Sequence, residues 1–126
     1  MRALVLVVAV FPAFSLGVPV PSPSVPGPFE PNVGQAEPAA LFQSRTAGWC
    51  LSLTRTGAFV QTPYSRIDIE FAGSNPAADV LAVDPIEGRL NFLHGARQDW
   101  RTNVPLYSRV EYHGVYPGID VAFYNH

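Results

Sequence analysis

Arg66-Ile67-Asp68-Ile69-Glu70-Phe71 is the stretch of this 126-residue sequence that most directly indicates a fold. Its apolar residues alternate with charged ones, and a period of two is typical of a β-strand with one face in water. The residues that follow, Gly73-Ser74-Asn75-Pro76, strongly favour a turn. The segment therefore predicts one strand of an antiparallel sheet.

Similar short segments, separated by Gly, Pro and Asn turns, occur on both sides of this strand. We expect strands at Leu41–Ser44, Trp49–Thr54, Ala58–Gln61, Asp79–Val83, Arg89–Leu93, Leu106–His113 and Ile119–Tyr124. Between them we expect a helical turn at Gly95–Trp100 and a loop from Arg101 into Pro105. No stretch has a sustained helical period. The pattern predicts an all-β domain over residues 29–126, either an antiparallel sandwich or a barrel-like sheet.

The last expected strand, Ile119–Tyr124, is followed only by Asn125 and His126. An exposed edge strand invites pairing with another chain. We therefore expect either that this edge is used for pairing or that the natural domain continues and the sheet is incomplete at its C-terminal edge.

Residues 1–17 have the features of a secretory signal peptide. Arg2 supplies a positive start, Ala3 to Phe14 form an apolar run broken only by Pro12, and small residues follow at Ser15 and Gly17. The run is shorter than the ~20 apolar residues that span a bilayer, so an uncleaved anchor is the weaker alternative. We expect a secreted or cell-surface protein, cleaved after Ser15 or Gly17.

The segment from Val18 to Pro28 is rich in proline, which predicts an extended linker before the β domain. Eight basic and ten acidic residues nearly balance, which argues against nucleic acid as a partner. No basic amphipathic stretch suggests membrane binding after cleavage. The lone Cys50 cannot form an internal disulfide; it is either a buried or half-buried free thiol or a site of pairing between chains.

A catalytic constellation is not visible in the sequence, and we expect no catalytic, cofactor or metal site. Asp68 and Glu70 lie on one strand face, roughly 7 Å apart, but a solvated polar face is the simpler interpretation than a glycosidase pair. His113 and Asp120 could meet across a hairpin, yet two ligands fall short of the three or four of a usual metal site.

Three segments carry a family resemblance: residues 29–35 (FEPNVGQ), 100–105 (WRTNVP) and 115–121 (VYPGIDV). Residues 48–54 and 88–93 agree with them. In this order and spacing they resemble the N-terminal domain of unknown function of secreted bacterial proteins that carry SBBP-type β-propeller repeats. The resemblance implies that a further strand and then the repeats follow the segment at 119–124. Cys50 departs from it, since a hydroxyl or aliphatic residue is expected there.

We interpret the residues of these motifs as structural, not catalytic. Trp100 is expected to plug one end of the core, Arg101 to hold a carboxylate such as Asp120, and Asn103 to cap a loop. Pro117 and Gly118 are expected to make a turn in which proline holds φ and glycine takes a positive φ. The structural set is Asn32, Gln35, Trp100, Arg101, Asn103, Pro117, Gly118 and Asp120.

The functional hypothesis from sequence is a non-enzymatic, extracytoplasmic β module with a structural, adhesion or assembly role. Its expected partner is a protein or a glycan at the cell surface. Two alternatives stay open. One is a carbohydrate-binding or glycan-active domain that uses exposed aromatic residues with Asp68 and Glu70, and the other is a non-functional gene fragment.

Overall fold

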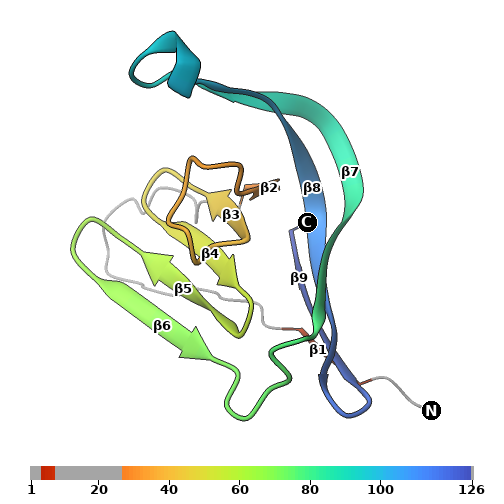
Figure 1. Cartoon of the computed structure of the whole chain (residues 1–126). Helices are drawn as coiled ribbons and strands as arrows, with labels where there is room; N and C mark the ends of the chain where they lie inside the picture. Colours follow the sequence, from red (N-terminus) through yellow and green to blue (C-terminus); the bar gives the residue numbers. More distant parts are fainter. Residues whose placement is uncertain (1–3, 8–26, 126) are drawn as a thin grey trace, which may run out of the picture.

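A single sheet, curled into an open half-barrel, makes up most of the molecule (Figure 1). The computed structural model describes residues 4–7 and 27–125. The predicted all-β class is confirmed, in its barrel-like form. Apart from residues 4–7 and 27–28, the expected signal peptide and proline-rich linker lie outside the described residues.

The strands pair with antiparallel neighbours at every junction except one. Their bounds are β1 Leu4–Val7, β2 Phe29–Pro31, β3 Phe42–Arg45, β4 Cys50–Thr54, β5 Gly57–Gln61, β6 Arg66–Glu70, β7 Asp79–Phe92, β8 Arg101–Tyr116 and β9 Ile119–Tyr124. The order is β1-β9-β8-β2-β3-β4-β5-β6, with β7 on β8. The exception is β1, which runs parallel to β9.

The long hairpin of β7 and β8 differs from the prediction. Two strands and a loop were expected here, but β7 is continuous and β8 begins at Arg101. Proline lacks an amide donor, which made Pro85 and Pro105 look like strand breakers. Both instead pair within the ladder, Pro85 with Tyr107 and Pro105 with Arg89. The strands bend without ending because residues 87 and 88 are inserted on β7, where Gly88 has a φ of +109°.

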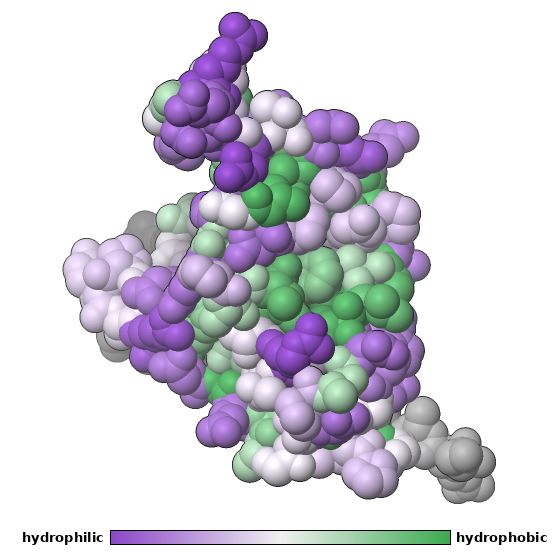
Figure 2. All heavy atoms as spheres, in the orientation of Figure 1, coloured by the Kyte–Doolittle hydropathy of each residue, from purple (hydrophilic) through white to green (hydrophobic). Residues whose placement is uncertain are grey.

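The short 3-10 helix Arg97–Asp99 closes this hairpin, where a helical turn was expected. None of its residues is buried. In Figure 2 the tip of the hairpin projects at the top as a hydrophilic knob, whereas hydrophobic surface gathers near the middle of the same face. The described helix is far too short to cross a membrane.

The core lies where β8 and β9 pack against the β4–β5 hairpin. Tyr112 is at its centre, fully buried, with its ring 5.6 Å from that of Phe71 and 5.9 Å from that of Phe123. The Tyr112 hydroxyl donates a hydrogen bond to the carbonyl of Thr54 at 2.6 Å. On β8, Leu106, Val110 and Tyr112 are all buried and form the inward face of the strand.

Candidate functional site

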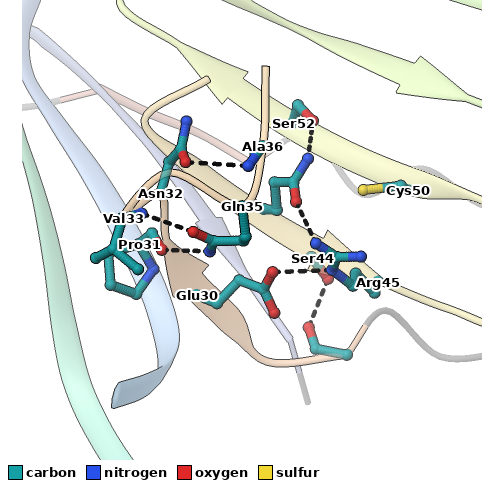
Figure 3. A network of polar contacts seen from close by, with 12 residues as sticks. Glu30, Pro31, Asn32, Val33, Gln35, Ala36, Ser44, Arg45, Cys50 and Ser52 are labelled. Atoms are coloured by element: carbon teal, nitrogen blue, oxygen red, sulfur yellow. Dashed lines mark hydrogen bonds and ion pairs between the residues drawn. The ribbon is translucent and has the colours of Figure 1, made fainter. Parts of the chain in front are cut away.

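The first sequence motif folds into a loop organised by Asn32. The Asn32 loop, residues 32–40, connects β2 to β3. The Asn32 amide nitrogen donates to the carbonyls of Glu37 at 3.0 Å and Ala40 at 2.8 Å. Its side-chain oxygen accepts from the backbone amides of Gly34 at 2.9 Å and Ala36 at 3.2 Å. One side chain thereby supplies two donors and two acceptors to the loop backbone. Figure 3 draws its contact with Ala36.

Gln35 secures the start of the same loop. Its side-chain oxygen accepts from the amide of Val33, and its nitrogen donates to the carbonyl of Pro31, both at 2.7 Å. These bonds hold a tight turn in which Gly34 has a φ of +110°. A residue with a Cβ would be strained there, so glycine is required by the backbone.

Arg101 joins the first motif to the second. Its Nε donates to the carbonyl of Val33 at 2.8 Å, and its Nη1 donates to the carbonyl of Asp99 at 3.2 Å. A Cβ added to Gly34 would lie 3.0 Å from Arg101 Nε, so the glycine also allows this close approach. The expected pairing of Arg101 with Asp120 is wrong, because the guanidinium donates to backbone carbonyls of the Asn32 loop and of the closed end of the β7–β8 hairpin.

The opposite end of the Asn32 loop reaches β6. Glu37 lies 3.1 Å from Arg66 Nη1, although β3, β4 and β5 separate β2 from β6 in the sheet. The guanidinium of Arg66 also lies 3.8 Å from the centre of the Phe59 ring. The loop therefore crosses the polar face of the sheet from one side to the other.

Under the loop, a polar row of Glu30, Gln43, Arg45 and Ser52 runs across β2, β3 and β4 (Figure 3). Glu30 is 1% exposed and accepts from Arg45 Nε at 2.8 Å. Arg45 Nη2 donates to the Gln43 oxygen at 2.9 Å, and Gln43 donates to the Ser52 hydroxyl at 3.1 Å. A buried carboxylate needs such partners, since desolvation of an unpaired charge is costly.

The sequence interpretation missed this row. The usable signal was a period-two polar pattern on two successive strands, with Gln43 and Arg45 on one and Cys50 and Ser52 on the next. Such a pattern is equally typical of a strand face in water. Burial of the row comes from tertiary packing, which the pattern cannot show.

Cys50 lies beside the polar row, directly across from Arg45 in the ladder. Its thiol is partly buried, and burial raises the pKa of Cys50 above its ordinary value, against a smaller opposing effect of Arg45. A raised pKa lowers the fraction of thiolate, the nucleophilic form, near neutral pH. The geometry therefore favours the partly buried thiol over a reactive cysteine.

Trp100 does not plug the core as expected. It is only partly buried, next to the 3-10 helix, with the guanidinium of Arg97 5.6 Å from its ring centre. In the part of the chain that the structure describes, Trp100 is not a member of the hydrophobic core cluster. The reason is that the β7–β8 hairpin carries this end of the motif away from the centre of the sheet (Figure 1).

Asn103 is in a strand and not in a loop. It has a φ of +59° and occupies a β-bulge, where residues 102 and 103 of β8 face Asn91 alone on β7. Its backbone amide donates to the Asn91 side chain at 2.9 Å. Asparagine is among the few non-glycine residues that adopt this left-handed conformation readily.

Asp120 and Gly118 shape the hairpin between β8 and β9. Gly118 has a φ of +72° next to Pro117, which confirms the expected turn. The Asp120 carboxylate accepts from the backbone amide of Gly114 at 2.7 Å, in a segment where β8 carries extra residues. His113 also lies 3.6 Å from Asp120, but its other ring nitrogen contacts Glu111 at 2.9 Å.

The carboxylates of Asp68 and Glu70 lie on an ordinary solvent-exposed strand face. Asp68 is 2.9 Å from Arg66 on the same exposed strand, and Glu70 pairs across the ladder with Gly57. Within residues 4–7 and 27–125, no group of three or more His, Cys, Asp or Glu side chains could hold a metal ion. An open surface hollow of about 600 Å³ is lined by the bulged segment Pro85–Arg89.

These contacts show a common role for the polar motif residues, which is to hydrogen-bond the backbone of the chain itself. Asn32, Gln35, Arg101 and Asp120 each direct their polar side-chain atoms to main-chain amides or carbonyls of this chain. The structure brings Asn32, Gln35 and Arg101 together, and it places Asp120, Pro117 and Gly118 at a separate hairpin. The arrangement fixes two irregular segments of a β domain.

Comparison with known proteins gives one match. A family model described as "Domain of unknown function (DUF7948)" matches residues 29–126. No curated protein and no solved structure matches the chain.

Proposed function

This chain belongs to the DUF7948 family, and we propose that it is a non-enzymatic, extracytoplasmic β module of a secreted or cell-surface protein. Its role is structural, in adhesion or assembly. The observation that carries this proposal is the use of the motif side chains. The polar groups that a catalyst would aim at a substrate are here hydrogen-bonded to the chain's own backbone, at the Asn32 loop and at the β8–β9 hairpin.

The location is proposed from the leader pattern of residues 1–17, with the proline-rich spacer behind it. The test is a fusion of residues 1–28 to alkaline phosphatase, an enzyme that needs disulfides and is active only outside the reducing cytoplasm. We expect phosphatase activity in intact cells, and its loss when Val7→Asp places a charge in the apolar run. An inactive fusion would contradict the export proposal.

We further propose that the module precedes SBBP-type β-propeller repeats, on the strength of the three motifs at residues 29–35, 100–105 and 115–121. The genomic DNA beyond the codon for His126 tests this. An in-frame continuation into repeats would support the proposal. A stop codon with no repeats nearby would contradict this proposal and favour the alternative that the chain is a non-functional gene fragment.

A glycan-binding role is the second candidate, and one observation favours it: Tyr64 is 96% exposed in the turn before β6. An exposed aromatic ring is a common platform for sugars. We expect the full chain to bind no sugar on a glycan array. Reproducible binding that is lost in Tyr64→Ala, but kept in the conservative Tyr64→Phe, would overturn the assignment in favour of this candidate.

A further inference from the structure

The two ends of the sheet differ in character. At one end, β6 has the charged residues Arg66, Asp68 and Glu70, and most of the strand is exposed. Charges on an edge strand discourage pairing with other chains. This end of the sheet is therefore protected against pairing with another chain.

At the other end, where β1 is the outermost strand, its neighbour β9 has the composition of an interior strand. Val121, Ala122 and Phe123 are consecutive and all buried, so both faces of the strand are covered at this point. Continuous apolar runs are typical of strands that are buried on both faces of a sheet. The run contains no lysine, no proline and no bulge that would protect a free edge.

The backbone of β9 has a definite outward side. The amide of Asn125 donates to the carbonyl of Ser108 on β8 at 3.0 Å. Because amides alternate along a strand, those of Val121 and Phe123 also point to β8, whereas those of Asp120 and Ala122 point away from it. These two outward amides need a partner from a further strand.

In the structure that strand is β1. Residues Leu4–Val7 run parallel to β9, with Val5 opposite Asp120 and Val7 opposite Ala122. Among the described residues no other strand pairs with this edge. The sequence of β1, Leu-Val-Leu-Val, is uncharged and rich in a β-branched residue. The edge therefore accepts an extended apolar segment in parallel register.

We propose that the outer edge of β9 is a strand-acceptor site for an extended apolar peptide parallel to β9, and that Leu4–Val7 fills it only until the leader is removed. The second clause rests on the proposed export, since β1 falls within the expected signal peptide. After removal, the site takes an apolar strand from a partner, by the β-strand addition that many peptide-binding domains use. Pairing of this edge with the further strand that the family resemblance implies after residue 124 would overturn the proposal.

Hydrogen exchange in the full chain tests the edge itself. Consecutive amides of β1 point to opposite sides, so replacing both Val5 and Leu6 by proline removes a donor toward β9 whichever residue supplies it. We expect the amides of Asp120 and Ala122 to exchange about tenfold faster in this double variant, while Val121 and Phe123 stay protected. Unchanged exchange at Asp120 and Ala122 would overturn the proposal.

The acceptor role is tested by adding a peptide to the same double-proline chain. The probe is Leu-Val-Leu-Val flanked by lysines for solubility, and the control probe has proline at its two central positions. We expect the first peptide alone to restore slow exchange at Asp120 and Ala122. If neither peptide does so, the site is not a strand acceptor. If the double-proline chain dimerises without peptide, the edge belongs to a second copy and the proposal is wrong.

A pair of variants on β9 locates the binding. Ala122→Pro removes an outward amide and leaves the bonds to β8 in place, whereas Ala122→Ser keeps the amide. We expect peptide binding to be lost in the first and retained in the second. Equal binding by both variants would place the peptide elsewhere. The phosphatase fusion is independent of these measurements, so failure of export and failure of strand acceptance are distinguishable.

Discussion

Where regular strand pairing stops in this domain, single side chains supply the hydrogen bonds to the backbone. Asn32 replaces a ladder with four hydrogen bonds to the backbone of its own loop. Asparagine suits this position because it alone combines a short side chain with two donors and two acceptors. The residue was predicted to be structural from its motif, but the contacts explain why its amide is needed.

Replacement of Asn32 tests this account. Asn32→Ala removes all four bonds, and at a net of about 0.5–1 kcal/mol each in a partly exposed loop we expect a loss of about 2–4 kcal/mol. Urea unfolding of the full chain measures it. Asn32→Asp is the matched comparison: it keeps the two acceptors but turns a carboxylate oxygen toward the carbonyls of Glu37 and Ala40, so it should recover none of this stability. Equal stability of Asn32→Ala and the wild type would contradict the bonding scheme.

Individual strands are held in register by irregularities at defined residues. The bulge at Asn103 lets β8 continue past a point where a loop was expected, and the Asn91 side chain bonds the displaced amide. A positive φ at a non-glycine residue is the physical signal of such a site. The sequence showed only an asparagine after Arg101 and Thr102 and shortly before Pro105, which is equally typical of a loop.

Two substitutions at Asn103 should have opposite outcomes. Asn103→Val places a β-branched residue at a φ of +59°, and we expect it to lower the free energy of unfolding by about 1–2 kcal/mol. Asn103→Gly relieves the same constraint and should leave stability within about 0.5 kcal/mol. Thermal and urea unfolding report both. A tolerated valine would mean that the bulge is not maintained in solution.

Tyr112 connects β8 to the turn that follows β4. Burial raises the pKa of Tyr112 well above its ordinary value of 10.0, while Arg55 opposes the shift more weakly. The folded chain thus keeps the phenol protonated at a pH where the unfolded chain releases the proton. Its contribution to stability is complete below about pH 10 and is lost as the pH rises above that value.

Tyr112→Phe gives the corresponding prediction. At about pH 8 the variant should be less stable by about 1–2 kcal/mol, because the Thr54 carbonyl loses its donor. At about pH 10.5 the difference should shrink, since only the wild type has this phenol to deprotonate. Urea unfolding at the two pH values measures the change. Tyr64→Phe, at an exposed site, is the control, and its stability difference from the wild type should not change between the two pH values. If the difference for Tyr112→Phe also stays constant, the proposed effect of the buried phenol on stability is refuted.

The whole molecule depends on contacts between segments that are far apart in the sequence. The rings of Phe71, Tyr112 and Phe123 meet at centroid distances of 5.6, 5.9 and 6.4 Å. They join the connection after β6 to β8 and β9. Edge-to-face aromatic pairs add to the burial of apolar area, so this cluster stabilises the curl of the sheet.

Phe123→Ala should therefore be severe. The side chain is 4% exposed, and its loss leaves a cavity between the two parts of the sheet. We expect a loss of about 3–5 kcal/mol in urea unfolding. Leu81→Ala, at a site that is 51% exposed, is the control and should change stability by less than about 0.5 kcal/mol. Similar losses in the two variants would show that the cluster is not the centre of the core.

By itself, the sequence determined the all-β class, the β9 bounds and the turn at Pro117-Gly118, because alternation and turn chemistry are local properties. It also identified the motif at residues 29–35. Only the tertiary structure decided that Arg101 binds Val33 and not Asp120, that Glu30 is buried, and that β7 continues past Pro85. Those outcomes depend on which segment of backbone, far away in the sequence, lies opposite each side chain. In a sheet whose strands pair across such long sequence separations, these neighbours are decided only when the whole sheet folds.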